Sequence, residues 1–335
     1  MLVFDRGFTM LAEDWRLSVT ASFRYDVIER FQEPPSLLFP ESAAEEAAAG
    51  FRIGPYHGCL PVGEGLTSTV YRAEAPLSQD AAVHALKVVH PYQTFEPHNP
   101  QREVKILKSL NHSAVIALLD SFRDQEQRLN SPPIQGHPRR ASLRPLKGII
   151  HRDIKPSAIL LDSEDGPAYL SDFGTAWHPD LSPSSEPAGA MILDIGTGAY
   201  RPPDALFGNK SYSTPADMWS LGVLLSESAS TNPNGPTPIF ESPPTHEDGS
   251  QLGLILSIFR TLGTPTPETW PEATKFKTTP FGMWRVFEPR APDEAFASVQ
   301  EGFRGLVASL LRFESGDRPS AEMVGIALQH ECMRV

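Results

Sequence analysis

Short apolar runs alternate with turn-forming residues in the first third of the chain. The runs at 60–62, 70–73 and 85–89 predict three strands separated by turns. Residues 102–110 carry two apolar rows at helical spacing and predict a helix, and the run at 115–122 predicts a further strand. This part of the chain is therefore expected to be rich in β-structure.

The second half has a different pattern. Residues 218–225 are apolar on nearly every side, which indicates a buried helix, and helical spacing returns at 252–262 and 302–311. Proline and glycine interrupt the pattern in three places: before residue 51, at 123–147 and at 231–249. The predicted organisation is an irregular N-terminal extension (1–50), a β-rich part (51–122), a Pro/Arg-rich loop (123–147) and a mainly helical part (148–335).

Composition and charge narrow the class of protein. The 335 residues include 40% apolar side chains, enough for a sizeable core in about two domains. The formal net charge of −12 argues against general binding to nucleic acid or to an anionic membrane. Two cysteines make no disulfide framework, and Asp5 and Arg6 interrupt the apolar start before a signal peptide could form. We therefore expect a protein of the cytoplasm, the nucleus or both.

A glycine-rich segment, Gly63-Glu-Gly65-Leu-Thr-Ser68, joins the first two predicted strands. A dinucleotide-binding fingerprint needs a helix after the glycines, and here a strand follows. Two interpretations stay open: an ordinary tight hairpin, or a hairpin whose bare backbone amides approach phosphate oxygens.

A lysine, Lys87, lies inside the apolar run at 85–89. One interpretation is an edge-strand lysine that extends to water. The other pairs it with Glu103 on the polar face of the following helix, which would hold the ammonium group against ligand phosphates.

The most specific signal is His151-Arg-Asp153-Ile-Lys155-Pro, followed nineteen residues after Asp153 by Asp172-Phe-Gly174. Phosphoryl transfer needs a carboxylate that orients and deprotonates a hydroxyl, a role for Asp153. It also needs a cation on the transferred phosphate (Lys155) and a carboxylate on magnesium (Asp172). Each residue alone has an ordinary structural explanation, but the ordered set does not.

With these motifs, the chain resembles a eukaryotic protein kinase of the cyclin-dependent-kinase-like (CMGC) group. The resemblance implies an α+β fold of two lobes, ATP and Mg²⁺ as cofactors, and a protein substrate with serine or threonine hydroxyls. It places ATP on Gly63, Gly65, Val70, Ala85, Lys87 and Glu103, magnesium on Asp172, and catalysis on Asp153 and Lys155.

Further residues match structural and regulatory positions of the family. Tyr200-Arg-Pro-Pro-Asp204 and Gly316-Asp-Arg318-Pro imply an ion pair between Asp204 and Arg318. Asp217 begins a segment similar to the central helix of the helical lobe. Arg152 is expected to dock a phosphate carried by residues 172–204; the candidates are Ser182, Ser184, Ser185 and Thr197, the last of them expected to be a structural hydroxyl instead.

Within the group, the motifs look most similar to fungal monomeric kinases that activate cyclin-dependent kinases, so a cyclin-dependent kinase is a candidate substrate. The 102–110 helix lacks the sequence that contacts cyclin, so a cyclin partner is not indicated and a monomer is expected. Neither nucleic acid nor a membrane is an expected partner.

Two departures from the family pattern bear on activity. Ala158 replaces the asparagine that ligates a second magnesium, so one-metal catalysis or a reduced rate is expected. Only residues 123–147 stand where the family has a strand, the adenine-binding hinge and two helices. Loss of two hinge hydrogen bonds would weaken nucleotide binding by roughly 10–50-fold.

Three hypotheses follow from that gap. The chain is an incomplete copy of a longer active kinase, a pseudokinase that binds without turnover, or a fragment that does not fold. The presence of Lys87, Glu103, Asp153, Lys155 and Asp172 favours the first, and the predicted function is a serine/threonine protein kinase.

Overall fold

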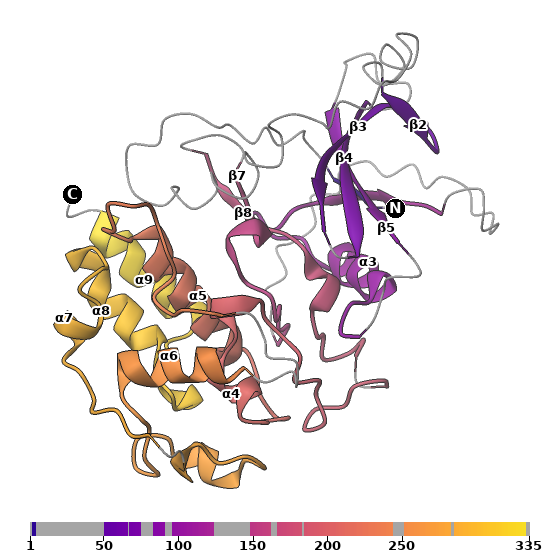
Figure 1. Ribbon diagram of the computed structural model, residues 1–335. Coiled ribbons are helices and arrows are strands. Elements are labelled where there is room, and N and C mark those ends of the chain that lie inside the picture. The colour runs from indigo at the N-terminus through magenta and orange to yellow at the C-terminus, as the bar shows by residue number, and fades with distance from the viewer. Residues whose placement is uncertain are drawn as a thin grey trace, which may run out of the picture. The chain divides into compact units, whose positions relative to one another are not determined.

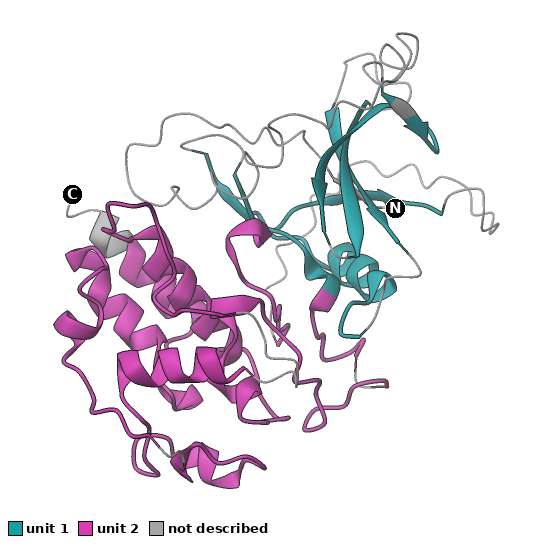
Figure 2. Ribbon diagram, viewed as in Figure 1, with its two compact units in different colours: residues 1–13, 24–147, 159–174 teal, residues 14–23, 148–158, 175–335 magenta. Residues whose placement is uncertain are grey.

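The computed structural model describes residues 2–4, 50–65, 67–74, 83–90, 96–123, 148–161, 166–182, 184–243, 251–282 and 285–332. They form two compact units (Figure 2). Unit 1 contains the described residues up to 123 and those of 159–174, and unit 2 contains 148–158 and the described residues from 175 onward. Residues 159–174 thus group with the β-rich part, although the sequence placed them in the helical part.

Several predicted segments lie outside the described residues. They are most of the N-terminal extension (5–49), the loop at 124–147, and residues 244–249 of the loop predicted at 231–249.

Unit 1 is built on a six-stranded sheet with the order β2-β3-β4-β5-β1-β6. Figure 1 labels β2 to β5 of this sheet. Its strands are β1 (Leu2–Phe4), β2 (Phe51–Ile53), β3 (Tyr56–Glu64), β4 (Ser68–Glu74), β5 (Val83–Val89) and β6 (Leu118–Ser121). The apolar runs that predicted strands lie within β3, β4 and β5, whose inward side chains form a core with the strand β2. Ala73 and Leu86 are fully buried there.

Strand β1 lies between β5 and β6 and pairs antiparallel with both. Val3 is opposite Leu86 on one side and opposite Asp120 on the other. The sequence predicted an irregular extension here, and for these three residues that prediction is wrong. A strand of three residues is too short to show a period, and its pairing depends on segments far away in the sequence.

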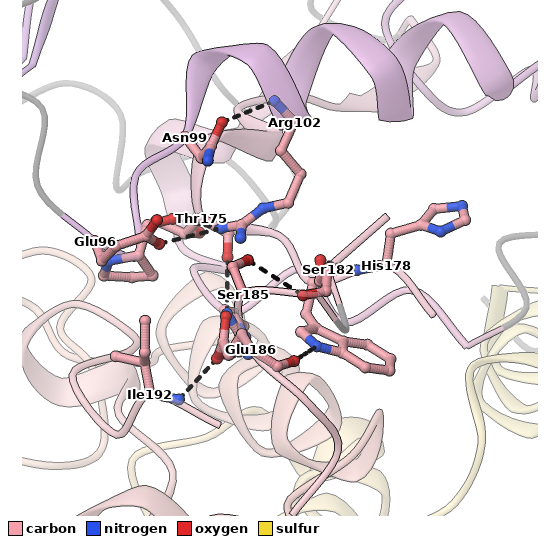
Figure 3. Close-up of polar contacts among 12 residues, drawn as sticks. Glu96, Asn99, Arg102, Thr175, His178, Ser182, Ser185, Glu186 and Ile192 are labelled. Atoms are coloured by element: carbon pink, nitrogen blue, oxygen red, sulfur yellow. Dashed lines mark hydrogen bonds and ion pairs between the residues drawn. The ribbon is translucent and has the colours of Figure 1, made fainter. Parts of the chain in front are cut away.

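Helix α3 (Pro100–Ser109) contacts β6 in the same unit. It starts two residues before the prediction because Asn99 caps it: the Asn99 side chain accepts a hydrogen bond of 2.9 Å from the Arg102 amide (Figure 3). Pro100 at the first helical position fits the same start. Ile106 and Leu107 bury the apolar face of the helix.

A two-stranded hairpin, β7 (Ile159–Leu161) with β8 (Ala168–Leu170), leads to Asp172. Val115 pairs with Leu170 in an isolated parallel bridge, so the run predicted as one strand at 115–122 divides between this bridge and β6. The hairpin is thereby attached to the rest of unit 1.

Unit 2 is mainly helical (Figure 1). Its helices are α4 (Pro203–Leu206), α5 (Pro215–Ser228), α6 (Leu252–Leu262), α7 (Pro292–Ala295), α8 (Glu301–Leu310) and α9 (Ala321–Cys332). Short 3₁₀ turns cover Pro156–Ala158, Phe173–Thr175, Gly198–Tyr200, Pro271–Lys275, Pro280–Gly282 and Ser315–Asp317. The predicted helices at 218–225, 252–262 and 302–311 correspond to α5, α6 and α8.

Aromatic rings fill the core of unit 2. Trp219 on α5 stacks on Phe240, and Trp270 packs against Phe207 and Phe313 with ring centroids 5.6 Å and 5.2 Å away. Trp219 and Trp270 are fully buried. This core anchors α5, whose first turn reaches the backbone of His151 and Arg152. In the described part of the chain, no helix has the length and apolar character required to cross a membrane.

Candidate active site

The glycine-rich segment forms the turn between β3 and β4. Gly63 is opposite Val70 in the ladder, and the Gly65 amide donates to the Ser68 carbonyl at 2.7 Å. A strand follows the glycines, as the sequence predicted, so the segment is a hairpin and not the start of a helix. The hairpin continues into β5, where Val70 lies opposite Lys87.

Lys87 connects two carboxylates of unit 1. Its Nζ lies 2.9 Å and 3.2 Å from the two oxygens of Glu103 on α3, and 2.7 Å from Oδ1 of Asp172. The Glu103 side chain is 2% exposed, whereas that of Asp172 is 43% exposed. Glu103 therefore fixes the lysine from the buried side, and Asp172 keeps an accessible carboxylate oxygen.

Burial alone would lower the pKa of the Lys87 ammonium group. The negative charges of Glu103 and Asp172 outweigh this effect and raise the pKa above its usual value. Lys87 is thus held as a cation, the form that a phosphate-binding lysine requires.

In the described part of the chain, the non-glycine residues with positive φ are Arg152 (73°) and Asp172 (60°). Both belong to the two motifs, His151-Arg-Asp153 and Asp172-Phe-Gly174, that predict phosphoryl transfer. Backbone in this region is unfavourable for side chains with a Cβ, and it persists where surrounding contacts hold it. Strained backbone at these two positions is an independent sign that they serve a function.

In unit 2, Asp153, Lys155 and Thr197 form a compact triangle. Lys155 Nζ lies 2.7 Å from Asp153 Oδ2 and 3.0 Å from the Thr197 hydroxyl, which donates to Asp153 Oδ1 at 2.7 Å. The Asp153 side chain is 10% exposed and that of Lys155 is 22% exposed. A carboxylate beside a cation and a hydroxyl group suits the deprotonation of an incoming hydroxyl next to a phosphate.

Asp217, in the first turn of α5, fixes the backbone before this triangle. Its two carboxylate oxygens accept hydrogen bonds from the amides of His151 (2.7 Å) and Arg152 (2.8 Å). Burial raises the pKa of the Asp217 carboxyl group, and the nearby positive charges and the two amide bonds oppose that rise. The buried α5 thus positions the loop that carries Asp153.

The Arg152 side chain is fully buried and forms a two-pronged ion pair with Glu186, at 2.5 Å and 3.0 Å. From the sequence, Arg152 was predicted to dock a phosphate, and Glu186 was not identified as its partner. Among the phosphorylation candidates, Ser182 is fully buried, and its hydroxyl accepts the His178 amide at 2.9 Å. An acidic residue within the segment was the available signal, but the path of the chain decides which acid reaches Arg152.

Asp204 and Arg318 form a buried ion pair at 2.8 Å. Arg318 also donates to the carbonyls of Arg312, Phe313 and Pro215, and its guanidinium lies over the Trp219 ring. These contacts tie α4 to the end of unit 2, which suits a structural role.

The donor set fits one magnesium ion. Asp172 offers a partly exposed carboxylate, and magnesium in kinases is bound by one or two carboxylates together with substrate phosphates. Ala158 is fully buried and carries no donor atom. Within the described ranges, no group of three or more His, Cys, Asp or Glu side chains is arranged to hold a metal by itself.

Comparisons with known proteins agree with this geometry. The model of the protein kinase domain family matches residues 146–332, more than half of the chain. The serine/threonine-protein kinase csk1 of Schizosaccharomyces pombe is 31% identical over 289 residues, which cover 77% of this chain and 89% of csk1.

A solved structure, the CAK complex from Chaetomium thermophilum bound to ATP-γ-S, aligns with a TM-score of 0.58. The alignment has 25% identity and covers 78% of this chain and 86% of the other. The predicted kinase fold and the predicted family are thus confirmed, and the family implies ATP binding. The chain belongs to the protein kinase domain family and is a serine/threonine protein kinase.

Proposed function

We propose that this chain transfers the γ-phosphate of magnesium-bound ATP to a threonine or serine hydroxyl on the activation segment of a cyclin-dependent kinase. The Asp153–Lys155–Thr197 triangle carries the proposal, because it presents a carboxylate and a cation at one point of unit 2. The likeness to csk1 and to the CAK complex supports this substrate class. A monomer without cyclin and a location in cytoplasm or nucleus belong to the same proposal.

Each unit contributes different residues to the proposed reaction. In unit 1, Lys87 is held as a cation by Glu103 and faces the phosphates, and the glycine hairpin offers backbone amides to them. Asp172 would hold a magnesium ion, which would supply positive charge against the phosphate oxygens.

In unit 2, Asp153 orients the substrate hydroxyl and accepts its proton as the new oxygen–phosphorus bond forms. Lys155 contacts both Asp153 and Thr197, so its ammonium group is positioned beside the reacting oxygen. The leaving ADP keeps the electron pair of the broken bond, so no further reactant is needed.

Purified full-length chain with γ-labelled ATP and a catalytically inactive cyclin-dependent kinase tests this function. We expect label on the activation-segment threonine of the substrate, and loss of the signal by ~10³-fold or more in Asp153→Asn. Replacement of that substrate threonine by valine is the matched control for the target site.

A second candidate, a pseudokinase, is favoured by one observation: Ala158 removes a magnesium ligand. ATP-dependent thermal stabilisation without any transfer, in a preparation that unfolds cooperatively, would establish this alternative. Transfer that persists undiminished in Asp153→Asn would instead contradict the roles assigned here.

A further inference from the structure

A buried acid occupies the place where a phosphate was expected. The guanidinium of Arg152 is fully buried, and both of its terminal nitrogens donate to the carboxylate of Glu186. The Glu186 side chain is 3% exposed. A parallel, two-bond contact of this kind is the strongest geometry for an arginine with an oxyanion, whether the anion is a carboxylate or a phosphate.

Glu186 also organises its own segment. Its Oε1 accepts the Ile192 amide at 2.7 Å, its carbonyl accepts the Trp177 indole N–H at 2.9 Å, and its amide donates to the Ser182 carbonyl at 2.9 Å. Figure 3 shows the contact between the Glu186 carboxylate and the Ile192 amide. The Glu186 side chain therefore joins the Ile192 amide to Arg152, and the Glu186 main chain is bonded to Trp177 and Ser182.

Arg152 passes this restraint to the catalytic residue. It directly precedes Asp153, its amide is held by Asp217, and its backbone has a φ of 73°. The Arg152 guanidinium also lies 5.4 Å from the centre of the Tyr212 ring. Asp217 fixes the Arg152 backbone and Glu186 fixes the Arg152 side chain. The orientation of the next residue, Asp153, therefore depends on both acids.

The neighbouring hydroxyls are poorly placed to supply a phosphate to this arginine. Ser182 is fully buried and already bonded to the His178 amide, and Ser184 and Ser185 are exposed while the Arg152 side chain is not. Phosphate on either exposed serine has no access to a guanidinium that Glu186 covers.

We propose that Glu186 is a positioning residue that holds Asp153 in its working orientation through Arg152, so that phosphoryl transfer needs no phosphate on residues 175–204. The inference rests on the proposed kinase function. Phosphorylation can order a segment by forming new charge-assisted hydrogen bonds. In this chain, we assign that ordering role to the Glu186 carboxylate.

The first test is removal of phosphate. The full-length chain is treated with a protein phosphatase until intact mass shows no phosphate, and its transfer rate is compared with that of untreated protein. We expect rates that agree within ~2-fold. A fall of ~10-fold or more on dephosphorylation overturns the proposal.

The second test is the isosteric change Glu186→Gln, which keeps shape and removes charge. We expect kcat to fall ~30-fold while the KM for ATP stays within ~2-fold, since the nucleotide residues of unit 1 are untouched. Asp180→Asn, an exposed acid in the same segment, is the matched control and should behave as the wild type. Equal kcat values in the two variants overturn the proposal.

A double-mutant cycle separates positioning from general stability. If Glu186 acts through Arg152, then Arg152→Gln combined with Glu186→Gln should lose no more than ~2-fold beyond the worse single variant. Multiplicative losses show independent action and overturn the proposal.

Amide hydrogen exchange tests whether Glu186 orders its segment, even if the wild-type chain shows no phosphoryl transfer. We expect the Ile192 amide, which donates to Glu186, to exchange at least ~10-fold faster in Glu186→Gln than in Asp180→Asn. Unchanged exchange overturns the proposal whether or not the chain is active, whereas failure of the proposed function alone would leave this difference intact.

Discussion

Ala158 ends the short turn Pro156–Ala158 after the catalytic loop, with its side chain fully buried. The exposed residue beside it, Ser157, carries an oxygen, but it projects from a different point of the turn. At the scale of single residues, the Ala158 methyl group is the main chemical difference between this site and a kinase site in which the protein supplies two metal ligands.

We predict that Ala158→Asn raises kcat by about tenfold, about 1.4 kcal/mol in the barrier, because a carboxamide oxygen can ligate a second magnesium ion. The measurement is kcat against magnesium concentration, in which a second activating phase should appear. Ser157→Asn, the same side chain one position earlier, is the control and should show a single phase. A single phase in both variants, with cooperative unfolding intact, would contradict the prediction.

The contacts of single residues were predictable to different extents. The sequence offered the pairing of Lys87 with Glu103 as one of two interpretations, because both residues lie in regular elements, and the structure shows that pair. Glu186 could not, because its segment follows an irregular path in which no period connects it to Arg152. Asp217 was noted as the start of a helix, but its role as acceptor for two loop amides needed the structure.

At the scale of elements, α5 and α8 approach each other closely at Gly222. A Cβ added to Gly222 would lie 2.8 Å from the Leu310 Cβ and 2.9 Å from the Leu311 Cδ2. By contrast, a Cβ added to Gly305 on α8 meets no atom within 4 Å. The two glycines therefore differ in what an added methyl group does, although both are helical.

We predict that Gly222→Ala lowers the free energy of unfolding by about 1–3 kcal/mol through overpacking. Gly305→Ala should raise it by about 0.5–1 kcal/mol, because alanine favours an exposed helical position. Urea denaturation of the two variants beside the wild type measures both effects. Stabilisation by Gly222→Ala would show that α5 and α8 are not packed as described.

The apolar pattern predicted the positions of the helices well and the ends of the helices less well. Leu252–Leu262 agrees with the structure in both bounds, since Gly263 with a φ of 89° ends it directly after the last apolar residue. Helix α3 starts earlier than its apolar rows because Asn99 and Pro100 set its first turn. Periodicity reports a buried face, whereas capping decides where a helix begins.

At the scale of the whole molecule, chain order and spatial order differ in the sheet of unit 1. Strand β1, from the first residues, separates β5 from β6 and completes the hydrogen bonding of both. The strand that carries Lys87 is thus supported by a segment that is distant in sequence, because Leu2 is opposite Lys87.

We predict that Val3→Pro lowers the free energy of unfolding by about 3 kcal/mol or more, since proline cannot donate a ladder hydrogen bond inside a central strand. ATP affinity should fall with it, because β5 loses a neighbour beside Lys87. Thr9→Pro, beyond the end of β1, is the control for proline itself. Equal stability and ATP affinity in the two variants would refute a role for β1 in the sheet.

The position of β1 also has a consequence for synthesis of the protein on the ribosome. Residues 2–4 are translated before both of their partners, and the second partner, β6, ends at residue 121. At about 5–20 residues per second, the nascent chain waits on the order of 6–25 s before the sheet can close. During that interval a nascent strand without its partners is open to chaperones and to aggregation, so translation speed between residues 4 and 121 should influence the yield of folded kinase.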